Sequence, residues 1–342
     1  MKKEALFGKT YQELQAVVKE VGLSSFTAKQ LADWLYKKGE AEIGRMTNIS
    51  VKGRSLLDEK YEVGLSAPVD VQQSADGTKK YLFAVNNNCF IESVMIPDDD
   101  RATLCVSSQA GCKMGCKFCM TARQGFQYNL TAGEIANQLA SVAESKQLTN
   151  VVYMGMGEPF DNIDEVLKSL EILTSDWGYA WSPKRITVSS IGIIPGLRRF
   201  LDESKCHLAI SLHNPFAGER QELMPMQKAY SIEDVIALIK KYDFTHQRRV
   251  SFEYIMFDGY NDTPRHAERL AQPLKGLECR VNLIRFHPIP DSNLRSSTDD
   301  AMNRFQQYLM KKGIVTTVRA SRGMDILAAC GMLSTAKKKE VK

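Results

Sequence analysis

Three closely spaced cysteines carry the clearest chemical signal in the sequence. Cys112, Cys116 and Cys119 follow a C-x3-C-x2-C pattern within a glycine-containing segment. Thiolates are soft ligands that suit iron–sulfur clusters or zinc. Because Lys113 and Lys117 lie between them, the segment is a polar loop rather than part of an apolar core. The spacing therefore predicts a metal centre with these three thiolates as ligands.

Two kinds of metal centre fit these thiols. A zinc site takes four ligands, and Cys105 could supply the fourth. Cys105 lies in an apolar run, however, whereas structural zinc sites more often draw two C-x2-C pairs from separate knuckles. On a four-iron cluster, three thiolates leave one iron open, and an open iron can bind the amino and carboxylate groups of S-adenosylmethionine (SAM). The cluster is the preferred interpretation, and zinc is the alternative.

A second motif covers residues 154–159, with the sequence MGMGEP. A dinucleotide-binding fingerprint would need glycine at position 160, where Phe160 stands, so that interpretation fails. Gly157 would let the backbone approach a ligand closely, and Glu158 would complement a positive charge on that ligand. Further candidates for ligand binding stand at the ends of later apolar runs: Ser189, Ser211, Leu212, His213 and His287.

Helical patterns fill the first 66 residues, which we expect to form a separate N-terminal domain. Thr10-x-x-Glu13 is typical of a capping box at the start of a helix. Thr27-x-x-Gln30 predicts the start of a second helix in the same way, and Gly39 would end that helix. The domain is therefore expected to be a small helical unit.

The remaining chain predicts two kinds of sheet. Extended runs at 69–73, 79–85 and 90–96 indicate a short antiparallel β extension within 67–97. From residue 98 onward, apolar strands alternate with helices, which indicates an α/β fold with a parallel sheet. Six such units are too few for an eight-fold barrel, so we expect a partial (βα)6 TIM-like barrel in 98–342 rather than an open doubly wound sheet. The strands are expected at 102–107, 150–154, 185–190, 207–212, 250–256 and 280–285, and an extra strand at 314–318 would extend the sheet.

Composition bounds the class of protein. Of the 342 residues, 44% are hydrophobic and 25% are charged, which is ordinary for a globular chain. Forty-five Lys and Arg against 40 Asp and Glu give a net charge of +5, which permits a nucleic-acid partner without requiring one. We find no apolar leader and no stretch of about 18 apolar residues, so we expect no membrane span. The expected location is the cytoplasm, where the eight cysteines would serve as ligands, nucleophiles or core residues.

The cysteine motif, with Phe118 before its last cysteine, resembles the signature of the radical SAM superfamily. The segments 101–109, 155–159, 209–213 and 328–331 follow in an order that resembles the dual-specificity RNA methyltransferases, which modify carbon 2 of adenosine in 23S rRNA and tRNA. The resemblance covers nearly the whole chain. It implies a radical-SAM barrel, a [4Fe–4S] cluster, SAM as cofactor, and RNA contacts by the N-terminal domain. Two alternatives stay open: a sister group with the same motifs that methylates carbon 8, and a zinc-stabilised RNA-binding protein without catalysis.

The resemblance also implies catalytic roles. Cys330 would accept a methyl group from one SAM molecule, and a second SAM, cleaved to a 5′-deoxyadenosyl radical, would activate that methyl group for addition to adenine. Cys105 would release the RNA by forming a transient disulfide with Cys330, and Glu92 would take the ring proton. Glu92 shares a strand face with apolar residues, which suits a general base. The family usually has asparagine where His287 stands here, so this cofactor contact is expected to lose one of an amide's paired hydrogen bonds.

The implied partners are 23S rRNA, tRNA, a flavodoxin-like electron donor and a thiol reductant. RNA binding calls for basic residues that neutralise phosphates. We expect part of the RNA-binding surface to come from basic pairs and clusters along the chain: Lys184-Arg185, Arg198-Arg199, Lys240-Lys241, Arg248-Arg249, Lys311-Lys312, Arg319, Arg322 and the tail 337–339.

Overall fold

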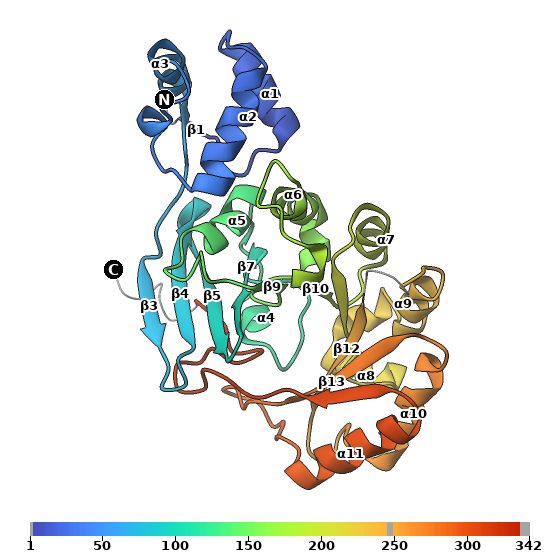
Figure 1. The fold of residues 1–342 in the computed structure, drawn as a ribbon. Coiled ribbons are helices and arrows are strands. Elements are labelled where there is room, and N and C mark those ends of the chain that lie inside the picture. Colours follow the sequence, from blue (N-terminus) through green and yellow to red (C-terminus); the bar gives the residue numbers. More distant parts are fainter. Residues whose placement is uncertain (1–2, 245–248, 336–342) are drawn as a thin grey trace.

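A ten-stranded mixed sheet forms the centre of the computed structural model, which describes residues 3–244 and 249–335 (Figure 1). The strand order is β14-β13-β12-β11-β10-β9-β6-β5-β4-β3. Neighbouring strands from β6 to β14 pair in parallel. The parallel strands are β6 (Arg101–Cys105), β9 (Asn150–Tyr153), β10 (Ile186–Ser190), β11 (His207–Ser211), β12 (Val250–Met256), β13 (Cys279–Arg285) and β14 (Val315–Val318).

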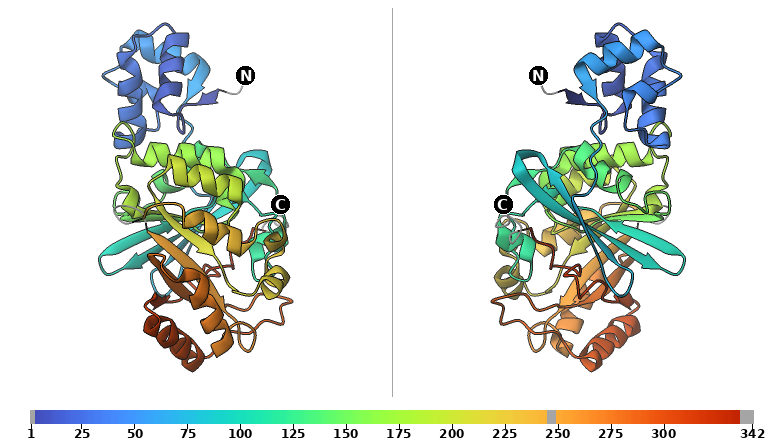
Figure 2. Two further views of the ribbon diagram at one scale, coloured as in Figure 1. Left: turned by 90° about the vertical axis from the view of Figure 1, so that its right-hand side faces the viewer. Right: turned by 90° about the vertical axis from the view of Figure 1, so that its left-hand side faces the viewer.

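Helices alternate with these strands and form a layer outside the sheet (Figure 2). Neighbours pack in chain order, with α5 on α6, α6 on α7, α9 on α10 and α10 on α11. In the described parts of the chain, no helix has the length and apolar character needed to cross a membrane. The helices of this layer are α5 (Ala132–Ala140), α6 (Ile163–Thr174), α7 (Ile194–Glu203), α8 (Ala217–Leu223), α9 (Ile232–Ile239), α10 (Pro264–Leu274) and α11 (Asp299–Lys311).

This arrangement confirms the partial TIM-like barrel. All six predicted strands are present, and the extra strand is β14, which pairs in parallel with β13. The barrel is open, because within the described residues β14 pairs only with β13, while β6 continues the sheet into the antiparallel strand β5.

The antiparallel extension continues the barrel sheet instead of standing apart from it. Because β5 pairs with β6, Val94 lies opposite Cys105. Glu92, on β5, is therefore on a strand adjacent to the one that ends in Cys105. The extension consists of β3 (Asp70–Gln73), β4 (Lys79–Val85) and β5 (Cys89–Asp98).

The N-terminal helices follow the sequence signals with one exception. Thr10 and Glu13 form the predicted capping box. The second box is wrong, because its helix begins at Phe26 and Thr27 lies inside the first turn, where its hydroxyl bonds to Ser24. The elements of this segment are β1 (Glu4–Ala5), α1 (Tyr11–Glu20), α2 (Phe26–Ala32) with a π-helical continuation (Asp33–Lys38) ending at Gly39, α3 (Val51–Lys60) and β2 (Tyr61–Glu62).

The N-terminal helices share an apolar core with the barrel helices. That core includes Ala132 and Ala136 of α5 and Ile172 of α6. The backbones approach most closely around Gly133, where an added Cβ would lie 2.6 Å from the carbonyl oxygen of Phe7. The absence of a side chain at position 133 therefore allows the two parts of the chain to dock.

Gly133→Ala is expected to destabilise this docked arrangement. The carbonyl of Phe7 belongs to the backbone and cannot rotate away, so the free energy of unfolding should fall by about 1 to 3 kcal/mol, as in other overpacked sites. Urea unfolding followed by the fluorescence of Trp34 and Trp177, which border this core, measures the loss. Gly44→Ala is the control, because a Cβ at Gly44 meets nothing within 4 Å. Equal losses in both variants would contradict the docking role of Gly133.

Candidate functional site

Residues from the carboxyl ends of the parallel strands line one cavity. Parallel barrels bind ligands at this edge of the sheet. The cavity brings together many predicted site residues: Cys112, Cys116, Cys119, Gly157, Glu158, Ser189, Ser211, His213 and Cys330. It also includes residues for which the sequence predicted no ligand role, among them Ser190, Glu253 and Arg319.

The cysteine loop leaves the barrel after β6 and is closed at its base by a short hairpin. β7 (Gln109–Ala110) pairs antiparallel with β8 (Tyr128–Asn129). At this base Gly111 has a φ of 72°, and a Cβ there would lie 1.7 Å from the carbonyl oxygen of Gly125. Both the left-handed backbone and the close approach require glycine. The two ends of the loop that carries the thiols therefore lie in direct contact at its base.

The three thiols of the loop all line the cavity. Cys112 is buried, while Cys116 and Cys119 are half-buried. Within the described residues, no group of three or more His, Cys, Asp or Glu side chains is placed to hold one metal ion. A four-iron cluster binds each thiolate through a different iron, so its ligands lie farther apart than those of a zinc site. Cys105, the fourth ligand of the zinc alternative, does not line the cavity.

Burial keeps two of the ligand thiols, Cys112 and Cys116, protonated in the absence of metal. It raises the pKa of Cys112 to about 12 and the pKa of Cys116 well above its usual value. A bound metal deprotonates coordinating thiols outright, so cluster assembly would release these protons. The donor set therefore fits an iron–sulfur cluster chemically.

The glycines of the MGMGEP motif let two strand ends touch. A Cβ on Gly155 would lie 2.7 Å from the carbonyl oxygen of Val106. Gly157 has a φ of 98°, and its Cβ would lie 2.5 Å from the side chain of Gln109. The segment after β9 thus lies directly on the segment after β6, which brings Glu158 to the cysteine loop.

Glu158 is a buried carboxylate held by backbone amides. Its side chain accepts N–H groups from Phe160 and Ile191, each over 3.0 Å, and the residue is 3% exposed. Burial raises its pKa to about 7, although hydrogen bonds from Ser190 and these two amides act in the opposite direction. A ligand's ammonium group would meet a carboxylate that is already oriented.

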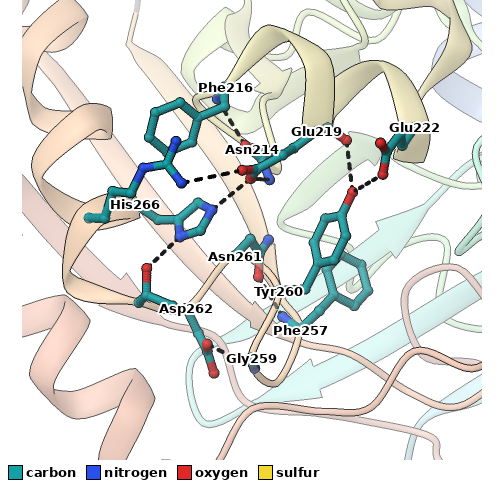
Figure 3. Close-up of polar contacts among 12 residues, drawn as sticks. Asn214, Phe216, Glu219, Glu222, Phe257, Gly259, Tyr260, Asn261, Asp262 and His266 are labelled. Carbon is teal, nitrogen blue, oxygen red and sulfur yellow. Dashed lines mark hydrogen bonds and ion pairs between the residues drawn. The ribbon is translucent and has the colours of Figure 1, made fainter.

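His213 contributes a neutral ring held in a left-handed backbone conformation, with a φ of 56°. Burial, together with the nearby charge of Arg220, lowers its pKa to about 3. Nδ1 accepts the N–H of Ile255 at 3.0 Å, so the proton of the neutral ring lies on Nε2. Asn261, drawn in Figure 3, donates to the carbonyl oxygen of His213 at 2.6 Å and stabilises this backbone.

The two thiols to which the resemblance assigns group transfer interact with each other and with Arg319. Cys330 is exposed and lines the cavity, whereas Cys105 is buried. Burial raises the pKa of Cys105 to about 12. The nearby Cys330 also raises this pKa, whereas the positive charge of Arg319 lowers it. Although residue 330 as a whole is exposed, the cavity wall around its thiol desolvates the sulfur and raises the pKa of Cys330, whereas the charge of Arg319 acts to lower it. All eight cysteines are free, so no disulfide joins the two thiols.

Arg319 and Glu253 form an ion pair in the cavity wall that the sequence analysis missed. Nε of Arg319 lies 3.6 Å from Oε2 of Glu253, whose other oxygen accepts from Asn282 at 2.8 Å and Ser251 at 3.0 Å. Arg319 therefore lies in the cavity rather than on the open surface expected of an RNA contact. The available signal for Glu253 was a carboxylate inside the apolar run 250–256.

A short helix after the cysteine loop, α4 (Met120–Gln124), holds the segment that carries Cys330. A backbone N–H of this helix donates to the carbonyl oxygen of Gly331 at 2.8 Å, and a threonine hydroxyl of the helix donates to the carbonyl oxygen of Leu333 at 2.7 Å. Gln124 also binds the groups of Thr335. The position of Cys330 therefore depends on the fold of the cysteine loop.

Four predicted site residues do not line the cavity: Glu92, Cys105, Leu212 and His287, all of them buried. Oε1 of Glu92 lies 3.4 Å from Nζ of Lys80, and Oε2 accepts the N–H of Ser334 at 3.1 Å. Glu92 thus binds the C-terminal segment close to Cys330 in the chain. Burial, with the nearby Arg285, lowers the pKa of His287.

Some of the predicted RNA contacts have other partners. Arg185 donates to the backbone carbonyl oxygens of Leu148 and Thr149. Arg199 forms an ion pair with Glu203 at 2.8 Å. Arg248 and the tail 337–339 lie outside the described residues. For the other pairs, RNA binding stays a prediction.

Comparisons with known proteins agree with the fold and the cysteine loop. Residues 106–271 match the family model of the Radical SAM superfamily, and residues 5–63 match that of the ribosomal RNA large subunit methyltransferase N-terminal domain. The crystal structure of a radical SAM methyltransferase from Sphaerobacter thermophilus superposes with a TM-score of 0.90 at 39% identity, over 96% of this chain and 99% of that chain. Fold and loop together define a radical SAM enzyme, a class that in general uses SAM and a [4Fe–4S] cluster.

Curated sequences narrow the class to one family. The probable dual-specificity RNA methyltransferase RlmN of Bacteroides fragilis is 58% identical over 99% of each chain. The dual-specificity RNA methyltransferase RlmN of Syntrophus aciditrophicus is 42% identical over 94% of each chain. This chain belongs to the RlmN family.

The raised pKa of Glu158 predicts a specific pH dependence of stability. The pKa is about 7 in the folded chain against an ordinary 4.5, so the folded state binds the extra proton between these values. The contribution of Glu158 to the free energy of unfolding is therefore complete below pH 4.5, and this contribution decreases by at most about 3 kcal/mol as the pH rises through 7. Glu158→Gln should remove this slope from the unfolding free energy of the metal-free protein, measured in urea between pH 4.5 and 8.

Glu59→Gln is the matched control, because Glu59 is exposed on α3. This variant should keep the pH dependence of the wild type. Parallel pH profiles for Glu158→Gln and the wild type would show that Glu158 does not retain a proton in the folded chain.

Proposed function

We propose that this chain is a radical SAM methyltransferase that methylates carbon 2 of adenosine in 23S rRNA and tRNA through an S-methylcysteine on Cys330. One observation carries the proposal: Cys330 lines the same cavity as the three loop cysteines and the Gly157–Glu158 pair. A methyl-accepting thiol, a cluster site and an ammonium-binding carboxylate thus share one chamber. A zinc-stabilised RNA-binding protein without catalysis would need no such convergence.

The cavity wall supplies the residues that would hold the cofactors. Cys112, Cys116 and Cys119 would bind the [4Fe–4S] cluster, and Glu158 would receive the ammonium group of SAM. When bound, cluster and SAM together supply a one-electron cleavage that allows hydrogen abstraction from an unreactive carbon. Polar groups at the ends of the next strands could contact the remaining parts of SAM: the hydroxyls of Ser189 and Ser211 and the Nε2–H of His213.

The two thiols and one carboxylate would carry the methyl group. Carbon 2 of adenine lies between two ring nitrogens and is electron-poor, so simple displacement at a sulfonium does not methylate it. Cys330 would deliver the methyl carbon to carbon 2 of adenine, which leaves the base bonded to the Cys330 sulfur through that carbon. The Cys105 thiolate would then attack the Cys330 sulfur: the S–S bond forms as the carbon–sulfur bond breaks, the electron pair stays with the carbon, and a proton completes the methyl group. The charge of Arg319 favours the thiolates that these steps require. To accept the ring proton, Glu92 would have to exchange its bond to Ser334 for the base.

Macromolecular and redox partners complete the proposal. 23S rRNA and tRNA would contact the N-terminal domain and exposed basic residues. A flavodoxin-like protein would donate the electron, and a thiol reductant would reopen the disulfide between Cys105 and Cys330. Because we propose these partners, the location that we propose for the reaction is the cytoplasm.

The expected product is 2-methyladenosine. Protein reconstituted anaerobically with iron and sulfide, then given SAM, an electron source and a 23S rRNA fragment, should form it, as measured by chromatography and mass spectrometry against 2-methyl and 8-methyl standards. 8-Methyladenosine would assign the chain to the carbon 8 sister group. A variant with alanine at Cys112, Cys116 and Cys119 should bind little iron and form neither product, because it lacks the thiolate ligands.

Iron content separates the proposal from the zinc alternative. Wild-type protein should be brown and contain close to four irons per cluster site. A colourless protein that binds zinc and no iron would overturn the proposed function. Full iron content and methylation in the triple variant would show that other residues hold the cluster.

Replacing each transfer thiol should stop the reaction at a different stage. Cys330→Ala should form no covalent bond to RNA, because the methyl carrier is missing. Cys105→Ala should accumulate a protein–RNA conjugate, because its carbon–sulfur bond to Cys330 cannot be resolved. A denaturing gel of each variant, incubated with RNA, SAM and an electron source, measures the slow-migrating band.

Cys279→Ala is the control, since Cys279 lies at the far end of β13 from the cavity and should retain turnover. The conjugate of Cys105→Ala should resist reductants, as a disulfide would not. A slow-migrating band from Cys330→Ala would refute the assigned roles. Full methylation by both Cys330→Ala and Cys105→Ala would refute them as well.

A further inference from the structure

Arg220 is a buried cation close to the cysteine loop. It lies on α8 and is 1% exposed. In the described part of the chain it forms no ion pair with a carboxylate, although burying an unpaired charge is costly. A buried arginine without a counter-ion therefore needs a functional or structural reason.

Neutral acceptors satisfy its hydrogen-bonding groups. Nε donates to the carbonyl oxygen of Leu212 at 3.0 Å, and Nη2 donates to those of Ser211 at 2.9 Å and Ile191 at 3.2 Å. Nη1 donates to the side-chain oxygen of Gln227. These bonds join the ends of β10 and β11, which line the cavity, but they bring no net negative charge.

The cysteine loop packs on the same helix. The N–H of Lys117 donates to the carbonyl oxygen of Leu223, the last residue of α8, at 2.9 Å. A Cβ on Gly115 would lie 3.6 Å from the ring of Pro225, just beyond that helix. Cys116, between these two contacts, is consequently held near Arg220.

The charge of Arg220 persists and acts on Cys116. Burial lowers the pKa of Arg220 to about 10, whereas the nearby Cys116 and Glu233 act to raise this pKa. The guanidinium therefore stays charged at neutral pH. Glu233 is exposed and reaches Arg220 only through Gln227, whose amide lies 3.4 Å from the Glu233 carboxylate. Metal binding would convert Cys116 to a thiolate and so place an anion near Arg220.

A polar network fixes α8, the helix that carries Arg220, to its neighbours (Figure 3). The amide of Asn214 donates to Glu219 at 2.9 Å, and Nε2 of His266 lies 2.7 Å from the same carboxylate. Tyr260 donates to the carboxylate of Glu222 at 3.1 Å. These contacts bind α8 to α10 and to the segment after β12.

We propose that Arg220 is a positioning residue whose buried positive charge compensates the cluster held by Cys116 and raises the cluster's reduction potential. The inference rests on the proposed function, because it presumes that cluster. Reduction adds one electron from the donor to the cluster without transfer of a proton to Arg220. A fixed cation at short range stabilises the added negative charge, since net charge and surrounding dipoles set the potentials of iron–sulfur centres.

The test is a redox titration of the reconstituted cluster, followed by electron paramagnetic resonance without SAM or RNA. Arg220→Gln should lower the ratio of reduced to oxidised cluster at a fixed potential about tenfold, equivalent to 59 mV for one electron. Gln227→Glu should act in the same direction, because it places a carboxylate against Arg220 while the arginine stays in place. Arg220→Lys should lie closer to the wild type, since it retains the charge.

Arg199→Gln is the matched control, because Arg199 is an exposed, ion-paired arginine on the neighbouring helix α7 and its loss should leave the potential unchanged. If Arg220→Gln fails to fold or bind iron, Gln227→Glu decides the question. A wild-type potential in Gln227→Glu would overturn the inference. A wild-type protein that assembles no cluster would instead overturn the proposed function.

Discussion

Parallel pairing from β6 to β14 is the constraint on which the rest of the site depends. It places the carboxyl ends of all these strands at one edge, where side chains far apart in the sequence become neighbours. Glu158 after β9, Ser211 at the end of β11, Glu253 within β12 and Arg319 after β14 meet in this way around one cavity. No local element could assemble that set.

The antiparallel side of the sheet and the C-terminal segment add the second half of the site. β5 lies beside β6, so Glu92 and Cys105 are on adjacent strands. Residues 331–335 then return across α4 and bind to Glu92 through Ser334. Cys330 is thereby held by a surface that includes the helix directly after the cysteine loop. The cysteine loop and the segment that carries Cys330 are therefore held together in this architecture.

Buried charge distinguishes this cavity from an ordinary apolar core. The carboxyl groups of Glu158 and Glu253 and the guanidinium of Arg319 line the cavity, and Arg220 lies behind it, bonded to the backbone of two lining residues. Of these four charged groups, Glu253 and Arg319 pair directly with each other. Backbone amides and carbonyls satisfy the others, which makes their burial tolerable. Groups held in this way cannot relax when a charged ligand enters, so their charges stay available to it. His213, kept neutral by burial, adds a donor without adding charge.

Local spacing in the sequence was sufficient to predict the alternation of strands with helices, and it singled out the cysteine loop and the Gly157–Glu158 pair, which line the same cavity. Each of these signals lies within a few residues, so no knowledge of distant contacts is needed. Thr27 shows the limit of such signals, because the helix begins one residue earlier, at Phe26, and the hydroxyl of Thr27 bonds to that of Ser24 instead of capping the helix. Tertiary structure alone placed Arg319 in the cavity, paired it with Glu253, buried Arg220 beside the loop and turned Glu92 toward Ser334. These placements depend on which strand ends become neighbours and where the chain returns, and periodicity specifies the face of an element without specifying what that face meets.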